Sequence, residues 1–268
     1  MALWIFLRGL TREAGHWGGF VDAFERALPG ARVIAIDLPG NGTLHHSTSP
    51  LDIAALVTHC RMQLASLGHQ PPYRVLGMSM GAMVTAQWAC EAPHELAAAV
   101  LINTSFRPFS PLQHRLRPRS LATLVRMLIL RPTTDEVEAQ ILQMTSNQQE
   151  QHQSELARWQ HIRRMRPVRF TNVLRQLVAA ARFRAARQAP ATPLLLLGSE
   201  QDQLVNVHCT LAIARCWHSA LALHPTAGHD LPLDDPDWVI HQVRSWHHAA
   251  QRPDSLLTGP LTALQPRV

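Results

Sequence analysis

A serine flanked by small and flexible residues is the first group in the sequence whose setting could support chemistry. It lies in the pentapeptide GMSMG, residues 77–81, between a predicted strand over residues 73–76 and a predicted helix over residues 82–90. Because the turn is so short, its tip residue is strained and the residues two positions either side must be small. The arrangement predicts a nucleophile elbow that exposes the hydroxyl of Ser79, although a G-x-S-x-G match by itself also occurs by chance.

A serine hydroxyl is a poor nucleophile until a base accepts its proton, and the base needs a group that orients it. Asp202 follows a predicted strand over residues 194–197, and His229 follows another over residues 220–224. The order Ser, Asp, His, with the last two after successive strands, is the order of a serine triad on a parallel sheet. Alternatives stay open: Asp202 could cap a helix or a turn, Glu200 is a rival carboxylate in the same loop, and the chain has 16 histidines.

Acyl transfer at a serine also needs two backbone N–H groups aimed at the negative charge that develops on the carbonyl oxygen. The N–H of Met80, directly after the serine, is one candidate for this oxyanion hole. The other is the N–H of Leu10, in the loop after the first predicted strand, where Gly9 lets the backbone come close. Gly9 could equally mark an ordinary turn, so this assignment depends on Ser79 being the nucleophile.

The elements that must position these groups alternate between strands and helices. Strands are predicted at residues 2–7, 32–37, 73–76, 98–102, 194–197 and 220–224, and helices at residues 21–28, 51–67, 82–90 and 238–249. The strands are apolar throughout, which is typical of strands buried on both faces. We therefore expect an α/β fold with a mostly parallel sheet that helices cover on both faces.

The alternation stops between residues 105 and 190, where only helical patterns occur. We expect helices over residues 120–130, 134–147, 154–165 and 170–187, and interpret this segment as an inserted helical lid. The core would then comprise residues 1–104 and 191–250, and residues 251–268 a loose C-terminal tail. The segment holds 15 Arg and 5 Asp or Glu, which indicates a solvated basic surface or a site for an acidic carrier protein.

Composition limits the class of protein. The chain has 268 residues, 46% of them hydrophobic, and no apolar run approaches the roughly 18 residues of a membrane helix. We interpret the apolar start as a strand and not a signal peptide. The four cysteines show no pairing pattern for a disulfide framework or a zinc site, which favours the cytoplasm and no metal. The net charge is +6, and every basic residue besides histidine is an arginine. We expect no nucleic-acid partner and no membrane span.

Several segments together resemble the α/β-hydrolase superfamily. They run from residue 3 to about residue 250 and read LRGLTREAGHWGGF, VIAIDLPGNG, VLGMSMGAM, PLLLLGSEQDQLV and TAGHDLPLDDP. Within the superfamily the chain is similar to the lid-bearing branch of small bacterial serine carboxylesterases, which includes esterases of pimeloyl-carrier-protein methyl esters. The resemblance implies Ser79 as nucleophile, His229 as base, Asp202 as its orienting acid, and Leu10 and Met80 as oxyanion donors.

The sequence departs from these relatives at two places near its start. They usually carry His-Gly where this chain has Arg8-Gly9, so the anchoring of the oxyanion loop is expected to differ. They also usually begin with an antiparallel hairpin, which this chain lacks. The sheet is then expected to have about six strands and an exposed new edge, which a homodimer could cover.

The expected reaction is hydrolysis of a carboxylic ester through an acyl-enzyme, without a cofactor. We expect Gly9, Trp17, Met78 and Phe106 to contact the substrate, beside the oxyanion donors, and the adaptable methionines suit short or medium acyl chains. The same triad could pass the acyl group to an alcohol or thiol, making the protein an acyltransferase. A catalytically silent binding protein of the same fold is a further alternative.

Overall fold

The computed structural model describes residues 2–148 and 152–250. They form one six-stranded sheet in the order β2-β1-β3-β4-β5-β6, with every neighbouring pair parallel. The strands are β1 (Ala2–Leu7), β2 (Ala31–Ile36), β3 (Tyr73–Met78), β4 (Leu96–Ile102), β5 (Leu194–Ser199) and β6 (Ala220–His224). The expected parallel sheet of six strands is confirmed.

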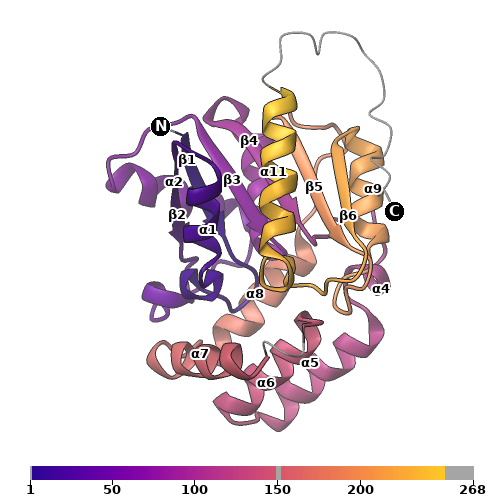
Figure 1. Ribbon diagram of the computed structural model, residues 1–268. Helices are drawn as coiled ribbons and strands as arrows, with labels where there is room; N and C mark the ends of the chain where they lie inside the picture. Colours follow the sequence, from indigo (N-terminus) through magenta and orange to yellow (C-terminus); the bar gives the residue numbers. More distant parts are fainter. Residues whose placement is uncertain (1, 149–151, 251–268) are drawn as a thin grey trace.

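Each face of the sheet has its own hydrophobic core, because alternate residues of a strand point to opposite faces. Ile5, Leu7 and Val75 pack on one face with α2 (Ile53–Ser66), α3 (Met80–Glu91) and α9 (His208–Trp217). Trp4, Phe6 and Leu76 pack on the other with α1 (Phe20–Ala27) and α11 (Pro236–Ala250), which Figure 1 shows in front of the sheet. The predicted cover of helices on both faces is confirmed.

The register of the strands brings the predicted site together. Leu7 of β1 pairs with Gly77 of β3, and Met78 of β3 pairs with Ile102 of β4. The loops that leave these strands at residues 8, 79 and 103 therefore start side by side at one edge of the sheet, as loops at the carboxyl ends of parallel strands do.

Between β4 and β5 the described residues, 103–148 and 152–193, form helices and one isolated β-bridge, between Arg107 and Arg184. The helices are α4 (Leu112–Arg115), α5 (Pro118–Leu130), α6 (Thr134–Thr145), α7 (His152–Met165) and α8 (Phe170–Arg182). We call α4–α8 the helical insertion. Figure 1 shows α5, α6 and α7 grouped below the sheet, with α8 leading back to it.

Two helices of the insertion end earlier than the sequence indicates, because contacts with the core replace the helical hydrogen bonds. The helix predicted to reach residue 147 ends at Thr145, and the N–H of Asn147 donates instead to the carboxylate of Asp234. The helix predicted to reach residue 187 ends at Arg182, and the N–H of Ala185 donates to the carbonyl of Arg107.

The remaining elements are short. They are α10 (Leu231–Asp234) and three 3-10 turns, η1 (Ala14–Trp17), η2 (Gly42–Leu44) and η3 (Pro93–Glu95). Helix α9 was not predicted from the sequence. Within residues 2–148 and 152–250, no helix combines the length and the apolar character needed to cross a bilayer. The predicted tail at 251–268 lies outside the described residues. β2 and β6 form the two edges of the sheet.

Candidate active site

Ser79 lies at the tip of a strained turn between β3 and α3. Its backbone has φ 55° and ψ −116°, a conformation that residues other than glycine rarely adopt. A Cβ atom on Gly77 would overlap Thr85 and the carbonyl of Gly81, and one on Gly81 would overlap the carbonyl of Leu7. The small residues predicted on either side of the serine are therefore required by the packing of the turn.

Two hydrogen bonds hold this turn to β4 and the residues after it. The N–H of Ser79 donates to the carbonyl of Ile102 at 2.9 Å, and the hydroxyl of Thr104 donates to the carbonyl of Ser79 at 2.9 Å. The strained conformation is thus fixed by its surroundings, and the hydroxyl of Ser79 is directed into the cavity described below.

His229 and Asp202 are adjacent and buried. Nδ1 of His229 donates to Oδ2 of Asp202 at 2.7 Å, since an ionised carboxylate can only accept. The other oxygen of Asp202 accepts from the N–H groups of Leu204 and Val205, at 2.7 and 2.9 Å. These bonds fix the carboxylate, and the carboxylate in turn orients the imidazole so that Nε2 is left for another partner.

Asn103, directly after β4, holds the histidine loop in place, and the sequence analysis missed it. Its side-chain amide donates to the carbonyl of His229 at 2.8 Å and to the hydroxyl of Ser199 at 2.9 Å. Its carbonyl oxygen accepts from the N–H of Ser199 at 2.8 Å. A polar residue at the carboxyl end of a buried strand was the signal that could have identified it.

The loop after β1 lies against the serine. A Cβ on Gly9 would come within 3.1 Å of Cβ and 3.6 Å of Oγ of Ser79. Within the described chain, neither the N–H of Leu10 nor that of Met80, the first residue of α3, donates a hydrogen bond to another residue. Two free donors near one serine hydroxyl are what an oxyanion hole requires.

Arg8 anchors this loop, whose anchoring was expected to differ from that of the resembled family. Its guanidinium donates to both carboxylate oxygens of Asp230, the residue after His229, and Nη1 lies 3.4 Å from the sulfur of Met78. The guanidinium also lies over the ring of Trp17, at 4.7 Å from its centre. Both partners of the ion pair are buried. A second anchor comes from the helical insertion, where Gln176 of α8 accepts from the N–H of Thr11 at 2.8 Å.

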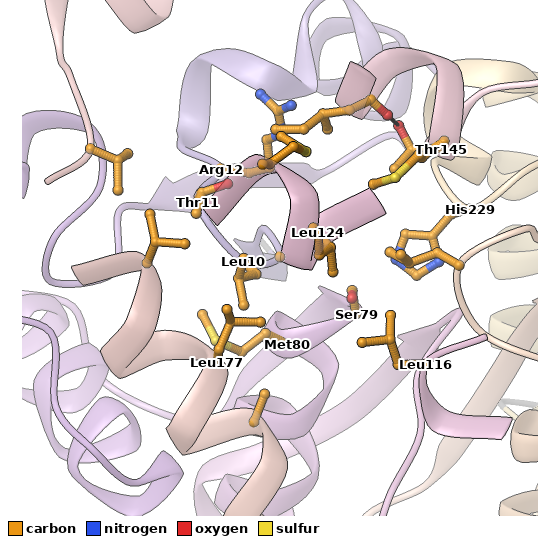
Figure 2. A pocket seen from close by; sticks show the side chains of 18 of the residues that line it. Leu10, Thr11, Arg12, Ser79, Met80, Leu116, Leu124, Thr145, Leu177 and His229 are labelled. Atoms are coloured by element: carbon orange, nitrogen blue, oxygen red, sulfur yellow. Dashed lines mark hydrogen bonds between the residues drawn. The ribbon is translucent and has the colours of Figure 1, made fainter. Parts of the chain in front are cut away.

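Ser79 and His229 face one cavity of about 630 Å³ between the sheet and the helical insertion. Figure 2 shows Ser79 with His229 on one side and Leu10 and Met80 on the other. The walls are mostly apolar and come from α5, α6 and α8, including Leu124, Leu128, Val137, Ile141, Val173 and Leu177. Such a site can enclose an apolar chain while its ester end meets the serine.

Of the four residues predicted to contact the substrate, the structure places two on the cavity wall and two in the hydrophobic cores. Gly9 and Met78 line the cavity beside the serine. Trp17 instead packs against Phe6 and Phe20 in the core under α1. Phe106 is fully buried among Phe183 and Trp217 on the other face of the sheet. Trp17 and Phe106 therefore do not line this cavity, because both aromatic rings are used as core filling. In the described part of the chain, no three His, Cys, Asp or Glu side chains gather to hold a metal ion.

Comparisons with known proteins agree with this fold. The family model for the alpha/beta hydrolase fold matches residues 5–236. No curated protein matches the sequence at a significant level. Among solved structures, the chain is similar to BpoC from Mycobacterium tuberculosis H37Rv, assigned as a non-heme bromoperoxidase, with 21% identity, a TM-score of 0.74 and 94% of each chain covered.

Two solved esterases are similar to the same extent. The esterase RhEst1 from Rhodococcus sp. ECU1013 has 19% identity and a TM-score of 0.73, over 92% of this chain and 90% of that one. A thermophilic esterase from Thermogutta terrifontis has 20% identity and a TM-score of 0.72, over 94% of this chain and 91% of that one. At these identities the likeness concerns the fold. Together with the match over residues 5–236, it places the chain in the alpha/beta hydrolase fold family.

Proposed function

We propose that the protein is a serine hydrolase that cleaves a carboxylic ester through an acyl-enzyme. The observation that carries the proposal is the strained Ser79, which shares a cavity with a histidine that Asp202 orients at 2.7 Å. The two esterases of similar fold support the reaction class. A protein that only bound ligands would not need a serine held in this unfavourable backbone conformation.

In the proposed reaction, His229 accepts the proton of Ser79 as the serine oxygen attacks the ester carbonyl. The negative charge that develops on the carbonyl oxygen is stabilised by the N–H groups of Leu10 and Met80. His229 then gives its proton to the leaving alcohol, and an acyl group stays on Ser79. Water, deprotonated by the same histidine, releases the acid, while Asp202 stabilises the imidazolium in both halves.

The cavity supports short or medium acyl chains. Its volume of about 630 Å³ and its apolar walls suit a chain rather than a small polar acid. An acyltransferase would use the same groups and an alcohol or thiol in place of water. The acidic carrier protein, the homodimer across the β2 edge and the cytoplasmic location stay predictions from the sequence.

The test is hydrolysis of p-nitrophenyl esters of increasing acyl length by the purified protein and by Ser79→Ala. We expect the rate of hydrolysis by the wild-type protein to peak at one acyl length. Ser79→Ala should lower that rate by at least about 10³-fold, as the removal of a triad member does. Equal rates for the two proteins at every length would contradict the proposal. Appearance of an acylated alcohol or thiol, when one is added, would instead favour the acyltransferase.

A further inference from the structure

Two buried arginines on the wall of the candidate active-site cavity share one buried carboxylate that does not line it. Glu138 of α6 accepts from Nη1 of Arg12 at 2.5 Å and from Nε of Arg163 at 2.6 Å. Arg12, Glu138 and Arg163 are 6%, 0% and 8% exposed. The guanidinium of Arg12 also stacks on the ring of Trp159, 4.2 Å from its centre. We call these residues the Arg12–Glu138–Arg163 cluster.

The charges of this cluster do not balance, because one carboxylate serves two guanidinium groups. Among the nearby carboxylates, Glu155 pairs with Arg158, and Glu13 pairs with Arg166 while it also attracts Arg163 and Arg12 more weakly. His16, which lies 2.7 Å from Nη1 of Arg12, adds no negative charge. Burial and the neighbouring Arg163 lower the pKa of Arg12 to about 10, with Glu138 opposing the shift. A buried cation without its own counter-ion costs stability, so folding alone gives no reason for the second arginine.

The excess charge borders the space that the substrate would occupy. Arg12 and Arg163 both line the cavity, as do Val137 and Ile141, which flank Glu138 on α6. Among the described residues, neither Nη group of Arg163 donates a hydrogen bond; only its Nε does. These two N–H₂ groups form the fork that matches a carboxylate.

The other charged residues of the cavity wall leave its net charge positive. Besides Arg12 and Arg163, the wall contains Arg8, Arg115 and Arg131, and Asp230 is the one acidic residue on it in the part of the chain described. Arg8 pairs with Asp230, while Arg115 donates to the carbonyls of Ala180 and Ala181. An apolar cavity with a positive wall attracts a chain that ends in an anion.

We propose that Arg163 forms an anion subsite in this cavity, and that the natural ester carries a carboxylate at the far end of an apolar acyl chain. The inference rests on the proposed function and names its substrate class. The ester bond of such a half-ester breaks with the uptake of one water, which yields a dicarboxylate and an alcohol. No oxidant, metal or co-reactant enters this balance.

The experiment compares two p-nitrophenyl esters of equal length, the hexanoate and the half-ester of adipic acid, which differ in a terminal methyl or carboxylate. The wild-type protein is compared with Arg163→Met and with the control Arg164→Met. Arg163→Met leaves Arg12 and Glu138 as a balanced pair, so it should fold, which its melting temperature checks. Arg164 is the neighbouring arginine, 56% exposed and paired with Asp135 outside the cavity.

We expect the wild type to have a higher kcat/KM for the adipate half-ester than for the hexanoate. Arg163→Met should lower the ratio of these two kcat/KM values at least about tenfold, because one charge-assisted contact is lost. Arg164→Met should keep the wild-type ratio. A wild type that prefers the hexanoate, or a ratio that Arg163→Met leaves intact, would overturn the anion subsite while ester hydrolysis stands.

A binding measurement keeps the inference testable if neither ester is hydrolysed. Calorimetric titration of Ser79→Ala with monomethyl adipate and with methyl hexanoate compares the two ends directly, without turnover. The subsite is supported if Ser79→Ala binds monomethyl adipate more tightly than methyl hexanoate and the double variant Ser79→Ala/Arg163→Met binds the adipate at least about tenfold more weakly. This result would support the subsite even where the proposed reaction fails. Equal binding of the two ligands contradicts it.

Discussion

Arg8 and Asp230 form a buried ion pair that joins two loops of the active site from opposite ends of the chain. Nη1 of Arg8 donates to Oδ1 of Asp230 at 3.0 Å across 222 positions of sequence. Arg8 begins the loop that carries Leu10, and Asp230 follows His229 directly. The pair therefore fixes the loop of Leu10 relative to the loop of His229, and we infer that Arg8 is a positioning residue for the proposed reaction.

The first prediction concerns this pair. Arg8→Met leaves Asp230 as an uncompensated buried charge, and Asp230→Asn does the same to Arg8. We expect each single change to lower the free energy of unfolding by about 3 kcal/mol, and the double variant to recover at least half of that loss. Chemical denaturation of the four proteins measures this coupling.

The pair of the exposed Arg61 with the partly buried Glu95 is the control. The side chain of Arg61 is 45% exposed, so Arg61→Met should cost less than about 1 kcal/mol. Additive losses in the Arg8 and Asp230 series, without recovery in the double variant, would show that the two side chains act separately.

A second prediction concerns the carboxylate of the triad. Asp202→Asn should lower kcat by about 10³–10⁴-fold, because an amide no longer holds His229 in the tautomer that accepts the serine proton. Glu200→Gln is the control, since Glu200 is exposed two residues earlier in the same loop. Steady-state kinetics on the best p-nitrophenyl ester checks both. A larger loss of kcat with Glu200→Gln than with Asp202→Asn would show that Glu200, and not Asp202, orients His229.

The sequence singled out the candidate residues that local pattern marks, and their roles stay predictions. Ser79 follows from the spacing of its glycines, and Asp202 and His229 follow from their places after apolar strands. The partner of Arg8 could not be predicted, because it depends on which loops the strand order brings together. Asn103 carried a local signal in its place after β4, but its contact with His229, like that of Gln176 with Thr11, joins segments far apart in the chain, 126 and 165 positions respectively.

The aromatic residues show another limit of sequence reasoning. Trp17 and Phe106 were expected to contact the substrate, but the structure packs both into hydrophobic cores. An aromatic side chain near a predicted site has the same sequence signal whether it faces a cavity or fills a core. Met78 and Gly9, which lie beside Ser79, line the cavity, and their contact with the substrate stays a prediction.

A third prediction tests how closely the oxyanion loop approaches the nucleophile. A Cβ added to Gly9 would lie 3.1 Å from Cβ of Ser79, so Gly9→Ala must shift the loop or Ser79 by a few tenths of an ångström and so change the geometry between Leu10 and the serine. We expect kcat to fall by about 10²-fold, the effect of losing one oxyanion donor. A Cβ on Gly19 meets nothing within 4 Å, so Gly19→Ala should leave kcat within about twofold. Equal activity of the two variants would contradict the close approach.

A fourth prediction concerns pH and His16. Burial lowers the pKa of His16 well below its ordinary 6.5, and the charges of Arg12 and Arg8 lower it further. The unfolded chain gains a proton at this histidine below about pH 6.5 and the folded protein does not. Stability from the neutral imidazole is therefore present above pH 6.5 and is lost as pH falls.

Unfolding free energies between pH 5 and 7.5 check this. His16→Gln should remove a slope of up to about 1.4 kcal/mol per pH unit below pH 6.5. His94→Gln, at an exposed histidine, should keep the wild-type slope. If the curve for His16→Gln runs parallel to that of the wild type, the imidazole is not held neutral by its surroundings.

The most direct measurement of the central claim is covalent labelling of the serine. The protein and Ser79→Ala are incubated with a fluorophosphonate, and the intact masses and the modified peptide are determined by mass spectrometry. An activated serine displaces fluoride and keeps the phosphonyl group, so we predict one adduct per chain on Ser79, none on Ser79→Ala and a strongly slowed reaction in His229→Ala. An unmodified wild-type protein, or an adduct on another residue, would contradict the assignment of Ser79 as the nucleophile.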